Sequence, residues 1–276
     1  MNNFGHHKLH NRYIFKGQLK LVTGLCLSSG RASNETDAPL MRQGVGEDGK
    51  PIIPGSSLRG AIRSELERIL AGVGKDTSGI ESCVLFTPES CDEKFREYKR
   101  SREREDGDLD DEKIMAFVLG GSHGHTGICD LCKLFGTSFY ASKLVIEDAV
   151  VESVYKPRVR DCVGIDRDTG AARDGVKFDY EVLEVDDNIA VTFKFKMMVE
   201  NMTAQDKTIL QLMDSLLREG IYVGGKRAGG LGMIQQVNTL EITGFQSAAK
   251  LWERLQGGVS AKIHDSISSW EEVMPC

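Results

Sequence analysis

The chain has 276 residues, of which 40% are hydrophobic and 28% charged, and its formal net charge is −6. This length suffices for one large domain or two small ones with a sizeable core. No run of 18 apolar residues occurs, and residues 1–11 lack the apolar stretch of a signal peptide, so the sequence predicts no spanning helix and a cytoplasmic location. The acidic balance argues against a nucleic-acid-binding protein, unless the basic residues are segregated on one surface.

The first half of the chain predicts a strand, a helix and an insertion. Aromatic and aliphatic residues alternate in part over 12–23, which is typical of a strand. Pro54 begins a turn whose serines are candidate helix caps, and apolar residues follow at helical spacing up to Leu70. Residues 72–143 are interpreted as an insertion, and its charged run, 92–113, as a solvated or mobile helix.

The second half predicts strands, a helix and a short C-terminal helical segment. A polar and basic excursion occupies 155–175, and a short amphipathic helix is expected within 246–276. Thr203 and Asp206 fit a capping box that opens a helix, which Gly220 closes. Residues 144–154 and 231–242 are each predicted to be a strand. Residues 176–199 alternate between apolar and polar residues in their second half and are predicted to be a β-hairpin or two strands.

The order of these elements indicates the fold class. Strand, helix, insertion, strands, helix and strand form a βαβ-type arrangement that occurs twice. Its simplest packing is an α+β, ferredoxin-like (split βαβ) sheet with helices on one face and insertions at one end. The chain shows no repeat of solenoid type. We expect a single domain over residues 1–276.

The first motif is the start of the predicted helix, IIPGSSLRGAIR. Ser56 and Ser57 stand where free helix amides attract a phosphate. Arg59 and Arg63 are four residues apart and therefore share a helix face. These four residues are candidate phosphate-binding residues. The alternative is an ordinary capped helix with two surface arginines.

The second motif is GGKRAGGLG at 224–232, with five glycines in nine residues. Unobstructed backbone amides beside Gly225, together with the charges of Lys226 and Arg227, suit a phosphate backbone. A nucleotide-binding loop is less well supported, because the motif precedes a predicted strand and does not open a helix. A flexible hairpin without a ligand remains the alternative.

The third motif is a Cys-x-x-Cys pair among seven cysteines. An odd number of cysteines in a long chain without a signal peptide does not indicate a disulfide framework. The pair is instead typical of half a structural zinc site, and the other two ligands are sought in the insertion. Reduced thiols are the alternative; a redox pair is disfavoured because no βαβ start precedes it. The candidate zinc ligands are Cys83, Cys91, Cys129 and Cys132, with His123 and His125 as alternatives.

Four motifs together carry a resemblance to a known family. IIPGSSLRGAIR, CDLCKLFGTSFYASKLVIEDA, GIDRDTGAARDGVKFDYEVLE and GGKRAGGLG occur in the order seen in the RAMP superfamily of CRISPR-associated proteins. From about residue 12 to 243 the chain is similar to backbone subunits of type III effectors, with type III-D as a candidate subtype. The resemblance implies a ferredoxin-like, RNA-recognition-type palm (about 12–71 and 181–243) and a β-hairpin thumb (about 155–180).

The resemblance also implies partners. These are a guide RNA, a complementary target RNA, copies of the chain or related backbone subunits, and other type III effector subunits. The candidate residues of the first two motifs would contact the guide backbone. The thumb would wedge into the duplex and displace a nucleotide, which costs a few kcal/mol per step.

A catalytic residue is implied by the resemblance alone. In type III backbone subunits a loop aspartate before Ser/Ala-Pro is implicated in target-RNA cleavage, and Asp37 matches it, with Glu35 as a spare carboxylate. One carboxylate and phosphate oxygens can hold Mg²⁺ or Mn²⁺, which would polarise the scissile phosphate. The alternative for the residue is an Asx turn before proline. The alternatives for the chain are a purely structural RNA-binding subunit and a nuclease that processes guide precursors.

Overall fold

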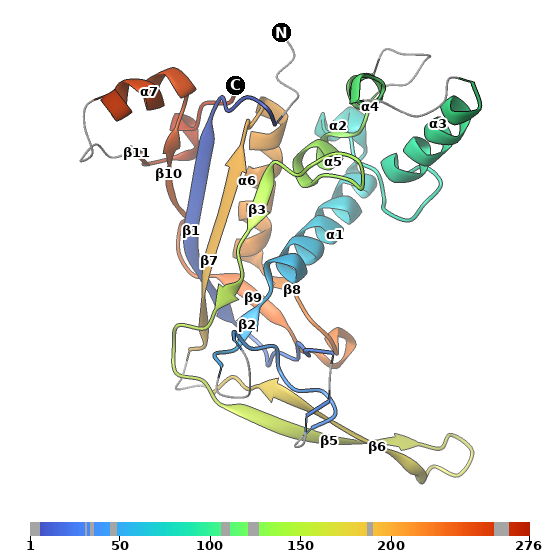
Figure 1. Ribbon diagram of the computed structural model, residues 1–276. Helices are drawn as coiled ribbons and strands as arrows, with labels where there is room; N and C mark the ends of the chain where they lie inside the picture. Colours follow the sequence, from blue (N-terminus) through green and yellow to red (C-terminus); the bar gives the residue numbers. More distant parts are fainter. Residues whose placement is uncertain are drawn as a thin grey trace.

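A central antiparallel sheet forms the body of the molecule (Figure 1). This computed structural model describes residues 6–30, 32–33, 36–44, 49–105, 111–120, 127–186, 190–256 and 265–276. The sheet has the order β11-β10-β1-β7-β3, and β9 pairs with both β1 and β8. Its strands are β1 (Arg12–Leu21), β3 (Leu144–Ile146), β7 (Thr192–Glu200), β8 (Ile221–Tyr222), β9 (Met233–Gln236), β10 (Glu241–Phe245) and β11 (Asp265–Ile267).

The two longest strands of the sheet, β1 and β7, pair along almost their whole length, from Arg12 opposite Glu200 to Lys20 opposite Thr192. Alternate side chains of each strand are buried, as a sheet with one covered face requires. The core side chains from these strands include Tyr13, Phe15, Leu19, Phe193, Phe195, Met197 and Val199.

Two long helices cover the apolar face. α1 (Gly55–Val73) and α6 (Ala204–Glu219) lie on the same side of the sheet in Figure 1. The predicted capping box is confirmed, because the Thr203 side chain accepts from Asp206 N–H and the Asp206 side chain accepts from Thr203 N–H. The spatial order β9-β1-β7-β3, with α1 after β1 and α6 after β7, is that of a split βαβ unit. The α+β prediction is confirmed.

The predicted last strand is two strands. β9 and β10 pair with the same edge of β1, at residues 19–21 and 12–16 respectively. Between them Leu240 crosses the middle of β1, where a Cβ on Gly17 would lie 2.7 Å from Leu240 Cδ2. Likewise, the predicted strand over 144–154 is divided into β3 and β4 (Ala149–Val150), and β4 leaves the sheet to pair with β2 (Ile52–Ile53).

The insertion folds beyond the C-terminal end of α1 (Figure 1). Its helices are α2 (Lys75–Ser78), α3 (Cys91–Glu105), α4 (Asp111–Leu119) and α5 (Asp130–Phe135). The charged run is therefore helical over its described part, and it is not wholly solvated. Phe95 of α3 stacks on Phe139 with ring centroids 3.7 Å apart, and it meets Phe117 of α4 at 5.3 Å. This aromatic cluster gives the insertion a small core of its own.

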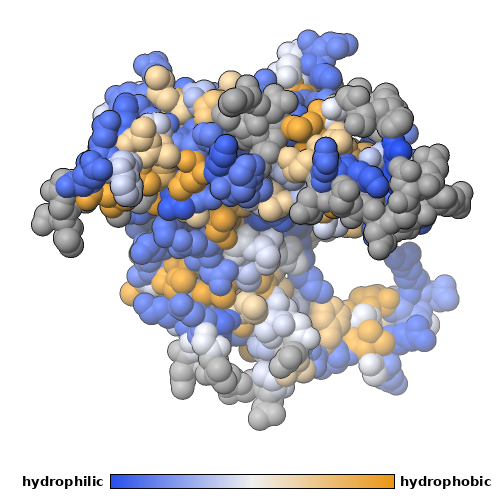
Figure 2. All heavy atoms as spheres, turned by 45° about the horizontal axis from the view of Figure 1, so that its top comes forward, coloured by the Kyte–Doolittle hydropathy of each residue, from blue (hydrophilic) through white to orange (hydrophobic). Residues whose placement is uncertain are grey.

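A long two-stranded arm projects from the opposite end of the sheet (Figure 1). It consists of β5 (Pro157–Ile165) and β6 (Ala172–Leu183), which coincide with much of the predicted polar excursion. Apolar side chains stay exposed along the arm, among them Val163, Ile165 and Phe178, and Figure 2 shows apolar atoms gathered on it at lower right. An arm that keeps apolar groups in water is typical of an element that inserts into a partner.

A short helix, α7 (Ala248–Gln256), and the 3-10 turn Trp270–Glu272 complete the described C-terminal segment. Trp270 stacks on Phe15 with ring centroids 5.1 Å apart. Within the described ranges, no helix has both the length and the apolar character needed to cross a bilayer.

Candidate nucleic-acid interface and metal centre

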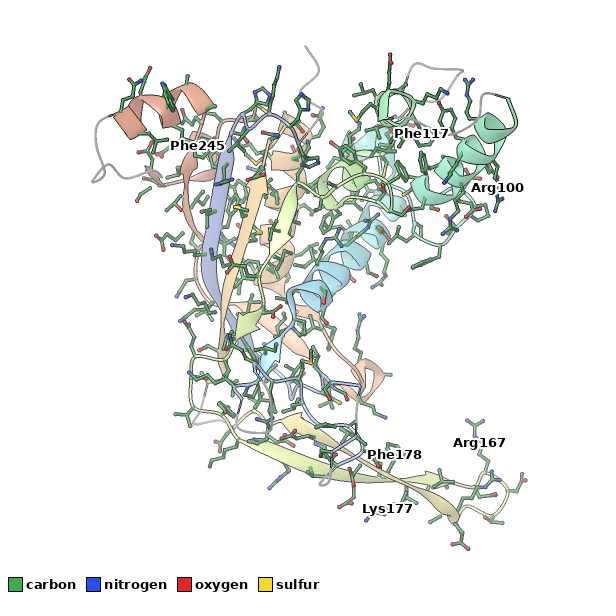
Figure 3. All side chains as sticks on the ribbon, in the orientation of Figure 1. Arg100, Phe117, Arg167, Lys177, Phe178 and Phe245 are labelled. Atoms are coloured by element: carbon green, nitrogen blue, oxygen red, sulfur yellow. The ribbon has the colours of Figure 1, made fainter. Side chains whose placement is uncertain are left out.

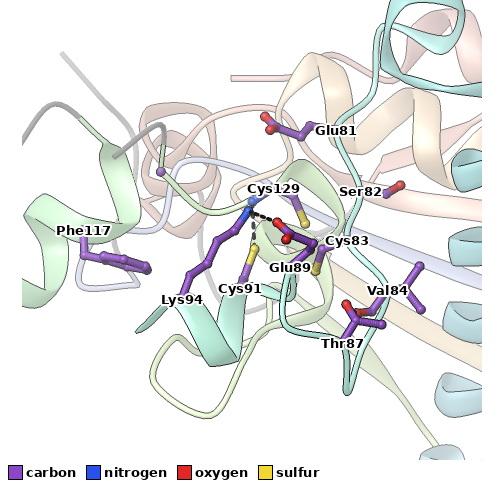
Figure 4. A pocket seen from close by; sticks show the side chains of 11 residues that line it. Glu81, Ser82, Cys83, Val84, Thr87, Glu89, Cys91, Lys94, Phe117 and Cys129 are labelled. Atoms are coloured by element: carbon purple, nitrogen blue, oxygen red, sulfur yellow. Dashed lines mark hydrogen bonds and ion pairs between the residues drawn. The ribbon is translucent and has the colours of Figure 1, made fainter. Parts of the chain in front are cut away.

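Four cysteine sulfurs converge beside α1. The Sγ atoms of Cys83, Cys91, Cys129 and Cys132 all lie within 4.8 Å of one another, and those of Cys83 and Cys132 are 3.5 Å apart. Figure 4 shows three of them at the wall of a cavity of about 400 Å³, near the Lys94–Glu89 ion pair. The four cysteines that the sequence predicted as zinc ligands are therefore close together in the fold. The alternative ligands His123 and His125 lie outside the described residues.

The geometry of the cluster fits zinc. Four thiolates around Zn²⁺ with Zn–S bonds near 2.3 Å lie about 3.8 Å from one another, close to the spread observed here. Backbone amides already support the sulfurs: Cys129 N–H donates to Cys91 Sγ at 3.3 Å, and Cys132 N–H donates to Cys129 Sγ at 3.4 Å. Such donors are typical of sites that hold thiolates.

Hydrogen bonding within the cluster shifts the pKa values of the thiols in opposite directions. Hydrogen bonding from Cys129 lowers the pKa of Cys83, whereas the hydrogen bond with Cys132 raises the pKa of Cys129. Thiolates this close repel one another, so a bound cation would be needed to ionise all four. A buried group of four cysteines that can bind a metal such as zinc is therefore a property of this fold.

Arg63 is buried against this cluster and is not available to a phosphate in this conformation. Only 7% of the residue is exposed. Its Nε donates to Glu67 at 2.8 Å, its Nη1 to the Gly136 carbonyl at 2.9 Å and its Nη2 to Cys132 Sγ at 3.2 Å. Burial lowers the pKa of Arg63, but Glu67 and Cys132 outweigh this effect and raise it, so the guanidinium stays charged. The side chain joins α1 to the cysteine cluster.

The start of α1 also differs from the sequence interpretation. Its N-cap is Pro54, neither serine caps it, and Gly55 N–H donates instead to Asp148 Oδ1 at 2.8 Å. A Cβ on Gly55 would lie 2.1 Å from the Ile146 carbonyl oxygen, which explains the glycine. The prediction of serine caps was wrong because the capping carboxylate comes from a distant part of the chain.

The other residues of the first motif are partly accessible. Ser56 is exposed and Ser57 half-buried. The guanidinium of half-buried Arg59 donates to the Phe135 carbonyl and lies 5.8 Å from the centre of the Phe135 ring. Burial, followed by the charge of Arg63, lowers the pKa of Arg59. Phosphate contacts by Ser56, Ser57 and Arg59 remain predictions.

The Gly-rich loop is fixed against the segment that follows β1. Gly225 N–H donates to the Cys26 carbonyl at 2.8 Å, and Gly232 N–H donates to the Gly24 carbonyl at 2.7 Å. Gly224 has φ +79°, and a Cβ there would lie 2.5 Å from the Cys26 oxygen. The loop is therefore ordered by close backbone approach, and it presents the exposed side chains of Lys226 and Arg227.

Lys226 lies over two aromatic rings at the root of the arm. Its Nζ is 4.7 Å from the centroid of Phe178 and 5.1 Å from that of Tyr180. The two rings stand 6.5 Å apart and nearly parallel, at 22°. Figure 3 shows Phe178 pointing from β6 toward the body of the molecule while Lys177 points away. We call Phe178, Tyr180 and Lys226 the aromatic platform.

Arg227, the other cation of the Gly-rich loop, also lies beside an aromatic ring. The guanidinium of Arg227 lies 5.9 Å from the ring centre of Tyr222, which is 40% exposed. Within the described part of the chain neither Lys226 nor Arg227 forms an ion pair, whereas Arg160 of the arm is paired with Glu184. Two unpaired cations beside exposed aromatic rings are the combination with which proteins bind single-stranded nucleic acid.

Asp37 lies beside β6, along the edge that does not pair with β5. Three N–H groups of β6 point to this edge: Leu183 donates to the Leu25 carbonyl at 2.9 Å, Glu181 to the Ala38 carbonyl at 3.0 Å, and Asp179 to Asp37 Oδ2 at 3.1 Å. The Asp37 carboxylate thus takes the place of a strand carbonyl. In return, Asp37 N–H donates to Asp179 Oδ1 at 2.8 Å. Asp37 is exposed, and Glu35 lies outside the described residues.

Most of the predicted site residues fall into two groups. Asp37 and the loop residues Gly225, Lys226 and Arg227 lie near the root of the arm, while the four cysteines gather beside Arg63 in the middle of α1. Sequence reasoning missed Phe178, Tyr180 and Asp179. The alternation of Lys177-Phe178-Asp179-Tyr180 was a usable signal for two different strand faces.

The fold and these sites define an α+β protein with an antiparallel split-βαβ sheet, a protruding two-stranded arm and a cysteine cluster. Comparison with known protein families matches the RAMP superfamily over residues 18–235. The chain belongs to the RAMP superfamily, which indicates a CRISPR-associated RNA-binding subunit that assembles with other CRISPR proteins. No curated protein matches the chain in a sequence comparison.

Proposed function

We propose that the chain is a guide-RNA-binding backbone subunit of a type III CRISPR effector, and that it cleaves complementary target RNA with a divalent metal ion at Asp37. In this proposal the sheet with α1 and α6 is the palm and the β5–β6 arm is the thumb. Copies of the chain or related subunits would lie side by side along the guide. The remaining partners would be other type III effector subunits.

The aromatic platform is the observation that carries RNA binding. An RNA base stacks on an exposed ring, and the Lys226 ammonium above Phe178 and Tyr180 can neutralise the adjoining phosphate. Gly225 and Arg227 on the same loop would contact the guide backbone. Two cations beside aromatic rings at the arm root would allow an acidic chain to bind RNA, because net charge is less informative than its distribution.

Asp37 supports the cleavage part of the proposal by its exposure and place. Its carboxylate stands at the root of the arm, where a target strand deformed by the arm would run. A Mg²⁺ or Mn²⁺ ion held by a carboxylate and phosphate oxygens would stabilise the charge that develops at the scissile phosphate. The rest of the chain would bind and orient the strand, which is a large part of the work in phosphoryl chemistry.

A cleavage assay tests the proposal. The assembled complex with its guide is given end-labelled complementary RNA and Mg²⁺, and wild type is compared with Asp37→Ala and with the matched control Asp76→Ala, a change in α2 far from the arm. The proposal expects cleavage by wild type and the control, and target binding without cleavage by Asp37→Ala. Cleavage by all three alike would place the active residue elsewhere.

Two alternatives give different results in the same experiment. A purely structural subunit binds target RNA in every variant and cuts in none. A precursor-processing nuclease cuts repeat RNA as the isolated chain, without guide or partners. Processing enzymes of this superfamily typically use histidine or tyrosine acid–base sites, so the second alternative is the less favoured.

A further inference from the structure

The loop that carries Asp37 is held by the arm at its edge. Successive outward-facing amides of β6 bond to the loop, as described above, and the Leu40 N–H donates back to Glu181 Oε2 at 2.8 Å. Arg42 adds an ion pair with Glu181 in which both side chains are largely buried. The position of Asp37 is therefore set by β6 and not by its own loop alone.

Asp179 makes the contact with Asp37 itself. Its Oδ1 accepts from Asp37 N–H at 2.8 Å, and its own N–H donates to Asp37 Oδ2 at 3.1 Å, so the two residues close a small ring of two hydrogen bonds. One carboxylate oxygen of Asp37, Oδ2, is thereby fixed, and Oδ1 has no hydrogen-bond partner among the described residues. Hydrogen bonds to a carboxylate are among the stronger ones in proteins, so the ring restricts the Asp37 rotamer.

The surroundings of Asp179 keep it in the state that this ring requires. The Thr36 hydroxyl and the Asp37 amide bond to its carboxylate, with Lys177 nearby, and these contacts lower the pKa of Asp179. The carboxylate is thus ionised at neutral pH and acts as an acceptor. Asp161 stands opposite Asp179 on β5, but its carboxylate is bound to Lys177 Nζ at 3.0 Å.

We propose that Asp179 is a positioning residue that fixes the Asp37 carboxylate for cleavage of target RNA, an inference that rests on the proposed function. Asp179 acts through Asp37 and does not itself contact the scissile phosphate. Because Asp179 belongs to the arm, the position of the cleaving carboxylate is coupled to the position of the arm on the RNA. A displacement of the order of 1 Å in a reacting group lowers rates by about 100-fold, so this coupling is large enough to decide activity.

The test compares Asp179→Ala with Asp179→Asn in the assembled complex, with single-turnover cleavage and target-RNA affinity as readouts. Asparagine retains an Oδ1 that accepts from the Asp37 amide, and alanine does not. We expect the alanine variant to lose about 10- to 100-fold in cleavage rate at unchanged RNA affinity. The asparagine variant should cut at a rate close to that of wild type. Asp161→Ala, on the facing strand, is the control and should cut normally.

Other outcomes overturn the inference. Wild-type cleavage by Asp179→Ala would show that the Asp179 carboxylate does not position Asp37, because the backbone N–H of residue 179 still donates to Asp37 in that variant. Equal losses in the alanine and asparagine variants, or an equal loss in Asp161→Ala, would exclude positioning by the hydrogen bond. Failure of the proposed function is seen separately, as an inactive wild-type complex or an Asp37→Ala variant that still cuts.

Discussion

Arg63 and Cys132 are joined directly: the Nη2 atom of the arginine lies 3.2 Å from the sulfur of the cysteine. The same guanidinium is paired with Glu67, and both side chains are less than 10% exposed. One buried cation is therefore paired with a carboxylate and also contacts a candidate metal-ligating sulfur. The arginine that sequence reasoning assigned to RNA instead ties the long helix of the body to the insertion.

Replacing Arg63 with methionine tests this structural role. The substitution leaves the buried Glu67 carboxylate without its partner, and breaking a buried pair in this way costs about 3–5 kcal/mol. Arg68→Met is the matched control on the same helix, because Arg68 is 69% exposed and its pair with Glu65 should contribute less than about 1 kcal/mol. Urea unfolding measures both. Equal, small effects would contradict the role of Arg63.

Metal content provides a second prediction. Protein purified without chelator should contain about one equivalent of zinc, and a strong chelator should lower its Tm because the metal binds only the folded cluster. Cys132→Ser should reduce the zinc content, whereas Cys276→Ser, at an exposed cysteine outside the cluster, should not. Elemental analysis and thermal unfolding provide the measurements. Less than half an equivalent in wild type would rule out the site.

The sequence predicted those features that local spacing encodes. The Cys-x-x-Cys pair, the Thr203 capping box and the glycines at 224–232 each act over a few residues, and each has a clear place in the structure. The α+β class followed from the order of helical and alternating segments, because such periodicity reflects which face is buried.

Contacts between residues far apart in the sequence could not be predicted from local spacing. Cys132 lies 69 residues beyond Arg63, and Asp148, which caps the long helix, lies 93 residues beyond Gly55. An arginine at helical spacing is typical of a surface residue until its partner is known. Similarly, the alternation in β6 predicts that Phe178 and Asp179 lie on opposite faces of the strand. It does not predict that Lys226 covers Phe178, or that Asp37 contacts Asp179.

The salt dependence of guide binding tests the Gly-rich loop. If Lys226 and Arg227 each neutralise one phosphate, each contributes about 0.7 to the slope of log affinity against log salt for a single strand. The double variant Lys226→Ala/Arg227→Ala should therefore flatten the slope by about 1.4. Lys250→Ala, on the C-terminal helix α7 away from the arm, is the control. An unchanged slope in the double variant would remove the loop from the RNA interface.

The aromatic platform predicts a contribution to RNA affinity that does not depend on charge. Stacking of one base on a protein ring contributes about 1–3 kcal/mol, so Phe178→Ala should weaken RNA binding by about 5- to 150-fold with little change in the salt slope. Ile165→Ala removes a more exposed apolar side chain farther along the same arm, and it serves as the control because it lies away from Lys226. Fluorescence titration of guide RNA at two salt concentrations distinguishes the effects. If Phe178→Ala binds as wild type does, the ring only supports Lys226; if both variants weaken binding equally, apolar contact along the arm, and not stacking at its root, holds the RNA.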